Sequence, residues 1–384
     1  MENLARRHAV FTAALVIALM IASIAMSDQG MSKTPLVIED QGSFFVSGTT
    51  VTAKGKYDST HPFPSPDDGQ TFQIDQMYIQ YQIPPNKRNL PIVFVHGLGQ
   101  TGKTWESTPD GREGFQSIFL RRGYAVYVVD FPKRGRAGFP SFNGPLGKLR
   151  SESLIPDLTS RMGNEDAFTI FRLGERYKTY FKNTAFPKAG LDQFLDQIVP
   201  YFDDNAAVIS DALSALLEKT GPAILITHSQ SSIIGWLTAV KSPNVKAIVS
   251  YEPAYYIFPE GNVPEIIPWY NGVKYPAGLG VAKEAFQRLT KMPIQIVWGD
   301  NIPDKPTPIT GLDVWRIVSH ISKDFVTAVN TAGGEASILR LPQAGLKGNT
   351  HFPFSDLNNQ NVAEMLSQFM KNYDLDKRGE KTKP

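Results

Sequence analysis

Short, nearly continuous runs of apolar residues recur through the middle of this chain. The runs span residues 91–95, 125–129, 223–226, 245–249 and 294–297. Runs of this length are typical of strands that are buried on both faces, as in a parallel sheet covered by helices. They predict the core strands of such a sheet, and residues 336–341 are a candidate for its last strand.

Segments with helical periodicity lie between these runs. They span residues 114–122, 206–218, 232–240 and 282–290, and an amphipathic stretch at 361–372 follows the last predicted strand. Strands that alternate with helices predict a doubly wound α/β sheet with helices on both faces. Residues 43–51 and 71–83 instead alternate apolar and polar side chains, which favours antiparallel strands at one edge of that sheet.

Two connections are too long for simple crossovers between strands. One spans about residues 131–204 and the other about residues 253–281. Long connections in a compact domain commonly form lids, binding loops or extra helices, so both are predicted to be inserted cap segments. In the first insertion, apolar residues at helix-like spacing from Phe168 to Phe181 predict a cap helix.

The N-terminus has the pattern of a secretory signal peptide. Arg6 and Arg7 precede an apolar run that ends near Ala25, and Ala25 and Ser27 form a small-residue cleavage pattern. An uncleaved anchor is the alternative, because the run approaches the roughly 17 residues that a short membrane span needs. Both interpretations place the folded domain in the periplasm or the extracellular space, with membrane attachment only if the segment stays uncleaved.

The remainder of the chain is interpreted as one domain, because α/β folds of this size often form a single domain. We expect the signal segment or anchor at residues 1–27, a linker at 28–42, the α/β domain at 43–374, and a polar tail at 375–384.

Composition narrows the classes of function. Lys and Arg total 39 against 37 Asp and Glu, so there is no basic excess that would favour a nucleic-acid partner. The absence of cysteine excludes disulfides, a cysteine nucleophile and thiolate metal sites. Because histidine–carboxylate clusters with metal-ligand spacing are also absent, the sequence predicts neither a metal nor an organic cofactor.

The strongest local signal for chemistry lies at residues 227–231. The apolar run at 223–226 leads directly into Thr-His-Ser-Gln-Ser, and a helical pattern follows. A strand, a sharp turn and a helix form the nucleophile elbow, in which the pattern G-x-S-x-G exposes a serine above the sheet. Here Thr227 and Ser231 replace the two glycines. Although a Ser-rich turn is often only a helix N-cap, its position after a core strand favours Ser229 as a nucleophile.

Elimination among six histidines selects the base that such a serine needs. The others lie in the signal segment (His8), a proline-rich loop (His61), two turns (His96 and His228) and a helical stretch (His320). His351 follows the last predicted strand and precedes the closing helix. The chain order of the elbow fold is serine, acid, histidine, so His351 is the predicted base.

Two carboxylates are candidates for the group that orients the histidine. Asp300 and Glu252 each follow a predicted core strand, and either could accept a hydrogen bond from His351. An oxyanion hole requires backbone N–H groups near the nucleophile. The loop at residues 96–100 follows an early strand, so the N–H groups of Leu98 and Gln230 are the predicted pair.

Aromatic residues on the loops around these motifs are candidates for the substrate pocket, although each could equally belong to the core. They are Trp105, Phe131, Tyr255 and Phe352, with Tyr256, Phe258, Trp269 and Phe354 beside them.

Residues 97–104 also match the phosphate-binding pattern G-x-x-x-x-G-K-[ST]. That pattern must open a helix at its lysine, whereas a turn signal, Pro-Asp-Gly, follows at residues 109–111.

Together these motifs give the chain a specific resemblance over roughly residues 75–372. They are His96-Gly97, Thr101-Gly102, Thr104-Trp105-Glu106, Thr108-Pro109-Asp110-Gly111-Arg112, Gly123-Tyr124, Gly135-Arg136, Ile170-Phe171-Arg172, His228-Ser229-Gln230-Ser231, Ser250-Tyr251-Glu252-Pro253, Gly348-Asn349-Thr350-His351 and Asp356-Leu357-Asn358-Asn359. In this order they resemble the bacterial esterase 713-like group of α/β hydrolases. The group's oxyanion loop has adjacent cysteines where this chain has Leu98-Gly99, and the insertion after Glu252 is longer here.

The resemblance implies the α/β-hydrolase fold and a glutamate acid, which favours Glu252 over Asp300. It implies a serine hydrolase that cleaves a small-molecule carboxylic ester through an acyl-enzyme on Ser229, without a cofactor. A lactonase or an amidase with the same residues is an alternative, because the fold does not choose among them. A non-catalytic, membrane-tethered binding protein is a further alternative, which the presence of Ser229, His351 and Glu252 disfavours.

Overall fold

The computed structural model describes residues 34–60, 69–138, 159–202, 205–272, 274–276 and 278–379. The predicted signal segment, parts of the linker, of the first insertion and of the polar tail lie outside these residues. The described residues from Ile38 onward belong to one compact unit. Across the described residues, no helix combines the length and apolar character that a membrane span requires.

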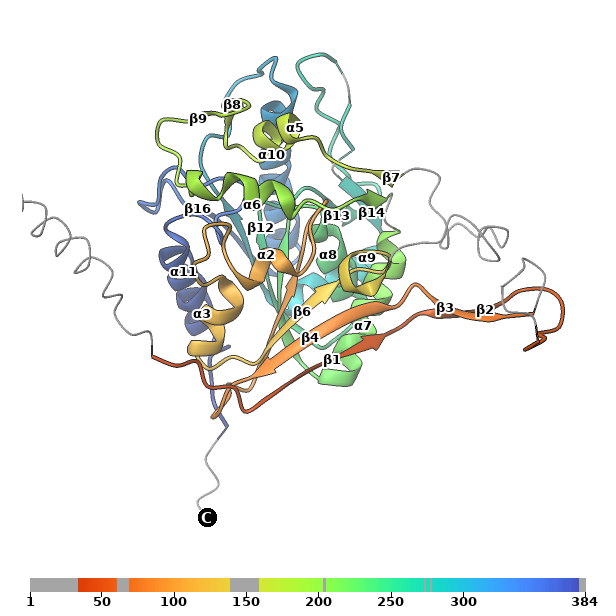
Figure 1. Ribbon diagram of the computed structural model, residues 1–384. Helices are drawn as coiled ribbons and strands as arrows, with labels where there is room; N and C mark the ends of the chain where they lie inside the picture. Colours follow the sequence, from red (N-terminus) through yellow and green to blue (C-terminus); the bar gives the residue numbers. More distant parts are fainter. Residues whose placement is uncertain are drawn as a thin grey trace, which may run out of the picture. The chain divides into compact units, whose positions relative to one another are not determined.

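An eight-stranded sheet forms the centre of this unit (Figure 1). Its strands, in spatial order, are β1 (Asp40–Val46), β4 (Met77–Ile83), β6 (Val126–Asp130), β5 (Ile92–Val95), β11 (Ala223–His228), β12 (Val245–Tyr251), β15 (Pro293–Trp298) and β16 (Glu335–Arg340). The pairs β1–β4 and β4–β6 are antiparallel, and all pairs from β6 to β16 are parallel. The predicted mostly parallel sheet with an antiparallel N-terminal edge is confirmed.

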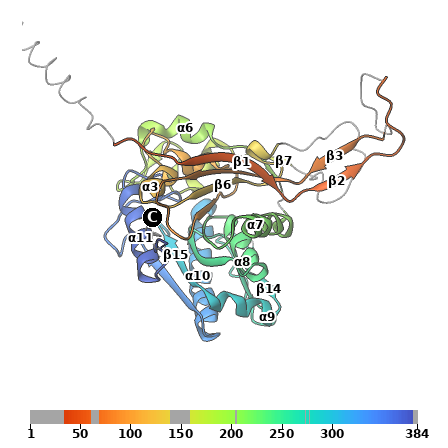
Figure 2. The ribbon, with the colours of Figure 1, turned by 90° about the horizontal axis from the view of Figure 1, so that it is seen from below.

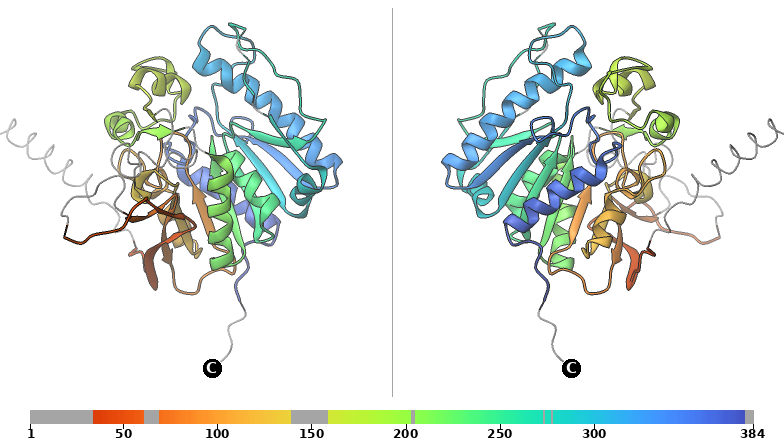
Figure 3. Two further views of the ribbon diagram at one scale, coloured as in Figure 1. Left: turned by 90° about the vertical axis from the view of Figure 1, so that its right-hand side faces the viewer. Right: turned by 90° about the vertical axis from the view of Figure 1, so that its left-hand side faces the viewer.

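Helices cover both faces of the sheet (Figure 3). Helices α3 (Phe115–Arg121) and α11 (Asn359–Asn372) pack together on one face. Helices α7 (Ala206–Thr220), α8 (Ser231–Lys241) and α10 (Thr310–Thr331) lie on the other. The predicted helix at 282–290 forms two shorter pieces, α9 (Lys283–Phe286) and the 3-10 helix η3 (Gln287–Lys291).

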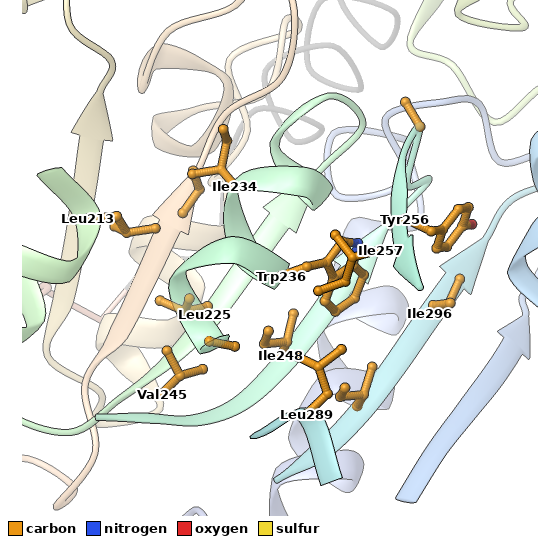
Figure 4. Packing of buried hydrophobic residues seen from close by; sticks show 14 of the residues in the cluster. Leu213, Leu225, Ile234, Trp236, Val245, Ile248, Tyr256, Ile257, Leu289 and Ile296 are labelled. Carbon is orange, nitrogen blue, oxygen red and sulfur yellow. The ribbon is translucent and has the colours of Figure 1, made fainter. Parts of the chain in front are cut away.

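The main hydrophobic core lies between the sheet and α7, α8 and α10 (Figure 4). Every residue of β11 is buried, because β5 and β12 flank the strand and helices cover both of its faces. Trp236 of α8 packs against Phe325 of α10, with 4.8 Å between the ring centroids. This burial fixes the C-terminal end of β11, where the chain turns into α8.

Each of the two predicted N-terminal strands is divided in two. Strand β2 (Thr49–Thr52) continues β1, and β3 (Thr71–Ile74) precedes β4. The backbone breaks at Ser47 and Gly48 on one side and at Asp75 on the other, all with positive φ. A residue with such a positive φ cannot continue a strand. The β2–β3 pair therefore leaves the main sheet as a separate two-stranded arm (Figure 2).

Both predicted insertions contain short elements of their own. The described part of the first holds η1 (Gly135–Ala137), β7 (Thr159–Ser160), α5 (Asn164–Ile170), β8 (Gly174–Arg176), β9 (Thr179–Tyr180), η2 (Lys188–Gly190), α6 (Leu191–Asp196) and β10 (Tyr201–Phe202). The second holds β13 (Tyr256–Pro259) and β14 (Gly278–Val281). The cap helix predicted to reach Phe181 ends at Ile170, because Arg172 has a φ of 57° and a β-hairpin follows.

Candidate active site

Ser229 occupies the sharp turn between β11 and α8. Its φ of 54° lies in the left-handed region, which is uncommon for a residue other than glycine. The Ser229 N–H donates to the carbonyl of Tyr251 at 3.0 Å, and the Ser229 carbonyl accepts from the N–H of Ala254 at 3.1 Å. The surrounding backbone therefore holds the strained turn that presents this side chain.

The turn accommodates Thr227 where the elbow pattern has glycine, because a glycine, Gly235, lies opposite it on the facing helix α8. A Cβ atom on Gly235 of α8 would lie 2.8 Å from Thr227 Cγ2, closer than such atoms approach. The hydroxyl of Thr227 donates to Ser250 Oγ at 2.8 Å, so its polar atom is also satisfied. Gly235 and Thr227 together give the close strand–helix approach that two small residues usually provide.

Ser231, the second replacement, ties the turn to the neighbouring strand. Its hydroxyl accepts from the His228 N–H at 2.8 Å and lies 3.0 Å from the carbonyl oxygen of Val95. Gly97, two residues beyond Val95, also approaches the turn closely. A Cβ atom there would be 3.1 Å from Ser229 Cβ and 3.0 Å from the His228 carbonyl oxygen.

The structure brings His351 and Glu252 together. His351 Nδ1 lies 3.4 Å from Glu252 Oε2, and both side chains are fully buried. Glu252 directly follows β12 with a φ of 51°, and His351 lies in the loop between β16 and α11. The ring of His351 packs on Trp315, with 4.1 Å between the centroids. The backbone N–H of His351 donates to the Phe171 carbonyl at 3.0 Å.

Arg172 completes this buried group, and the sequence analysis assigned it no role. Arg172 Nη2 lies 2.6 Å from Glu252 Oε1, and neither side chain is exposed. The Gly299 N–H donates to the same oxygen at 2.5 Å, so Oε2 is left to face His351. One signal could have identified Arg172: a single charged residue between Phe171 and Leu173 needs a partner if that apolar segment is buried.

Asp300 lies near the same loop but does not contact His351. Its carboxylate accepts hydrogen bonds from the Gly348 N–H at 2.8 Å and from Asn183 Nδ2 at 2.9 Å. Its backbone N–H donates to the Asn349 carbonyl at 2.8 Å. Asp300 therefore holds the loop that carries His351, and Glu252 is the carboxylate that faces the imidazole.

Burial keeps the histidines of this region neutral. The pKa of His351 is well below its ordinary value because of burial and of the nearby Arg172 cation. The pKa of His228 is lowered in the same way by burial and by His351. Since a carbonyl only accepts, His228 Nε2 donates to the His351 carbonyl at 2.8 Å. His228 thus holds the backbone of His351 in its loop.

The predicted oxyanion residues Leu98 and Gln230 both line a cavity that also contains Ser229. Within the described part of the chain, the backbone N–H groups of Leu98 and Gln230 donate to no other residue. His96 holds the Leu98 loop: its Nδ1–H donates to the Gly97 carbonyl at 3.0 Å, and its Nε2 accepts from the Phe131 N–H at 3.2 Å. Burial lowers the pKa of His96 to about 3, so this neutral form persists.

The cavity has a volume of about 690 Å³ and lies beneath both insertions. Its lining residues are Leu98, Ser160, Arg161, Met162, Asp166, Thr169, Ile170, Phe171, Tyr201, Ser229, Gln230, Ala254, Tyr255, Trp269, Tyr275, Thr310, Gly311, Val314 and Trp315. Glu252 and His351 lie below this surface, where neither has exposed area.

The alternative phosphate-loop motif does not open a long helix. The helix at its lysine, α2 (Lys103–Glu106), has 4 residues. Lys103 Nζ donates to the carbonyl of Ser107 at 3.0 Å. Gly97, the first glycine of this segment, instead allows the loop to pass close to the Ser229 turn.

Comparisons with known proteins agree with this architecture. The model of the alpha/beta hydrolase family matches residues 92–364, which is most of the chain. This chain belongs to the α/β-hydrolase family. A solved structure described as a novel bacterial esterase superposes on the hydrolase with a TM-score of 0.71 and 33% sequence identity. The superposition covers 88% of this chain and 97% of that one, so the resemblance to a bacterial esterase group is confirmed.

A curated relative of the hydrolase comes from a fungal source. It is named "Probable secreted lipase phiG" of Fungal sp. (strain ATCC 74256), and it is 28% identical over 336 residues. The match covers 78% of this chain and 86% of that protein.

The predicted pocket residues of the hydrolase fall into two groups. Tyr255 and Trp269 line the cavity. Trp105, Phe131 and Phe352 are buried and are absent from its lining, as are Tyr256, Phe258 and Phe354. They pack beneath the loops: Trp105 stacks on Phe354 with 4.1 Å between the centroids, and Phe131 contacts the ring of His96.

The buried ion pair generates a prediction about stability. We expect Arg172→Met to lower the free energy of unfolding by about 3–5 kcal/mol, because Glu252 would remain buried and charged without its partner. Urea unfolding followed by circular dichroism measures this. The exposed pair between Lys377 and Asp374 supplies the control, since Lys377→Met should cost less than about 1 kcal/mol. Adding Glu252→Gln to Arg172→Met should recover stability, and a double variant no more stable than Arg172→Met would contradict the charge argument.

The contact between Thr227 and Gly235 generates a second prediction. Alanine normally stabilises a helix relative to glycine by about 1 kcal/mol. We expect Gly235→Ala to destabilise the protein instead, by about 1–3 kcal/mol, because the new methyl group meets Thr227 Cγ2. Thr227→Ser removes only that methyl and keeps the hydroxyl, so the double variant should lose the penalty in thermal unfolding. If Gly235→Ala alone raised the melting temperature, the close approach would not limit this position.

Proposed function

We propose that this protein is an exported serine hydrolase of carboxylic esters that forms an acyl-enzyme on Ser229. One pair of observations carries the proposal: Ser229 lines a cavity at an elbow turn, and His351 faces the buried Glu252 at 3.4 Å. The names of the bacterial esterase and of the fungal lipase that the chain resembles support an ester as the substrate.

His351 acts as the general base in this mechanism. With Nδ1–H donated to Glu252 Oε2, the lone pair of Nε2 remains available to the serine hydroxyl. Among the described residues, Nε2 of His351 has no hydrogen-bond partner. Its lowered pKa keeps the imidazole neutral, which is the form that removes a proton from Ser229 as the oxygen attacks the ester carbonyl.

The backbone stabilises the charge that develops on the substrate. The attack moves a negative charge onto the carbonyl oxygen, and in this proposal the N–H groups of Leu98 and Gln230 donate to it. The imidazolium then gives its proton to the departing alcohol. Water, deprotonated by His351 in turn, attacks the acyl-enzyme and releases the acid, which regenerates Ser229.

We also propose that the chain is exported. The basic and apolar pattern of residues 1–27 supports this, as does the word "secreted" in the name of the fungal relative.

The proposed roles predict which variants lose activity. We expect Ser229→Ala to lower kcat for p-nitrophenyl butyrate by at least about 10⁴-fold, and Glu252→Gln by about 10²–10⁴-fold, since the base would lose its orienting charge. Asp300→Asn makes the same carboxylate-to-amide change in the loop and should retain activity within about tenfold. Initial rates from residues 28–384 and the three variants test this assignment.

Each alternative outcome changes a different part of the proposal. If Asp300→Asn were the damaging carboxylate change, Glu252 would not be the acid. Cleavage of lactones or amides without cleavage of esters would change the substrate class. A folded wild-type protein that neither hydrolyses these substrates nor reacts with a fluorophosphonate would contradict the proposed enzymatic function. It would favour the alternative of a non-catalytic binding protein.

The environment of His351 predicts the pH dependence of kcat/KM. A base works only when it is deprotonated, and the pKa of His351 lies below its ordinary value of 6.5. We therefore expect kcat/KM to be maintained at pH 6.5 and to fall only at lower pH. Arg172→Gln removes one cause of the lowered pKa, so the acid limb should move to higher pH. Arg172→Lys keeps the cation and serves as the control; equal limbs in the wild type and Arg172→Gln would contradict this electrostatic account.

A further inference from the structure

One wall of the cavity consists of three aromatic side chains stacked in a row. Tyr255 stacks on Tyr275 with 5.6 Å between ring centroids and an interplanar angle of 27°. Tyr275 stacks on Trp269 with 6.0 Å between centroids and an angle of 23°. All three line the cavity and belong to the second insertion. We call Tyr255, Tyr275 and Trp269 the aromatic row.

The aromatic row begins beside the nucleophile. Tyr255 is anchored to the elbow helix α8, because its N–H donates to Ser232 Oγ at 3.1 Å. Its carbonyl accepts from Ser232 Oγ and from Trp236 Nε1, each at 2.9 Å. The preceding residue, Ala254, donates its N–H to the carbonyl of Ser229 at 3.1 Å. A substrate group that extends from the reacting carbonyl toward this wall therefore contacts Tyr255 first.

The far end of the row is also held. The N–H of Tyr270, next to Trp269, donates to Asp313 Oδ2 at 2.8 Å. Asp313 is buried in α10 and pairs with Arg316 at 2.6 Å. Since both ends are fixed to helices of the domain, the row is preorganised, and binding along it requires little reordering of the protein.

Charge is absent from this side of the cavity. Among the described lining residues, only Arg161 and Asp166 are charged, and both are exposed residues of the first insertion. A volume of about 690 Å³ falls in the range of sites that bind drug-sized ligands, well beyond what an acetyl group fills. The ligand that fits this side is neutral and largely apolar.

We infer that the aromatic row is a substrate subsite for a neutral aromatic ring in the acyl or the alcohol part of the ester. This inference rests on the proposed ester hydrolysis and names its substrate class. Aromatic rings prefer offset-stacked or edge-to-face contact with other rings, which a saturated ring of similar size does not provide. The row therefore selects for aromaticity and not only for bulk.

Two matched pairs of esters test the subsite. They also distinguish a ring in the acyl part of the ester from a ring in the alcohol part. Ethyl 3-phenylpropanoate against ethyl 3-cyclohexylpropanoate places the ring in the acyl part. 2-Phenylethyl acetate against 2-cyclohexylethyl acetate places it in the alcohol part. Rates are measured by pH-stat, with ethyl acetate hydrolysis and fluorophosphonate labelling as the assay of the proposed function. We expect the phenyl ester of one pair to have a kcat/KM about 3- to 10-fold above its cyclohexyl partner.

Variants of the row should abolish that ratio. In Trp269→Leu and in Tyr275→Leu, the phenyl-to-cyclohexyl ratio should approach one; Trp269→Leu provides the test if Tyr275→Leu does not fold. Tyr270→Leu is the control, because Tyr270 is 58% exposed, adjacent to the row and absent from the cavity lining, so its ratio should remain that of the wild type.

The outcomes separate the subsite from the proposed function. Ethyl acetate hydrolysis without a phenyl preference in either pair would overturn the subsite alone. A preference that survives both substitutions would place ring recognition elsewhere in the cavity and would also overturn the subsite. Loss of both hydrolysis and labelling in the wild type would overturn the proposed function and the subsite with it.

Discussion

The charge pair between Arg172 and Glu252 is the interaction on which the rest of the site depends. A lone buried carboxylate costs several kcal/mol, and Glu252 has no exposed area. Arg172 and the Gly299 N–H both bind Oε1, which leaves Oε2 for His351. Because the pair is neutral overall, His351 does not face an uncompensated anion in an apolar environment. The arrangement orients the neutral imidazole and leaves its Nε2 without a proton.

Much of the fold could be predicted from the chain because its core strands are buried on both faces. A short apolar run such as 223–226 is typical of a strand buried on both faces, and the alternation with helices then indicates a parallel sheet. Local backbone breaks were harder to predict. Arg172 adopts positive φ although it is not a glycine, asparagine or aspartate, the residues that usually adopt this conformation, and Gly48 and Asp75 lie within segments that otherwise alternate like strands. Tertiary contacts impose these turns. The strands and the cap helix that periodicity predicted therefore extend beyond the positions where the observed elements end.

The site was predictable to the extent that chain order and strand ends define it. Ser229 and His351 follow from the elbow and from elimination, whereas Glu252 and Asp300 both end core strands and look alike in sequence. Only the resemblance favoured Glu252, and the structure shows it facing the imidazole while Asp300 binds the backbone of the loop. Phe352 illustrates the limit for pocket residues: next to His351 in the chain, it points into the core. Sequence adjacency does not specify the direction of a side chain at an irregular loop.

The two insertions contribute to the site in different ways, and both contributions involve the segment around Glu252. The first carries Arg172 to the buried carboxylate, and its neighbours Ile170 and Phe171 line the cavity. A change in that wall would therefore also displace the cation that neutralises Glu252. The second begins directly after Glu252, so Glu252 and the aromatic wall that starts at Tyr255 share one short segment anchored to α8. The outer parts of the insertions can thus vary, but where the insertions meet the core they are constrained by the same contacts that hold Glu252 and His351.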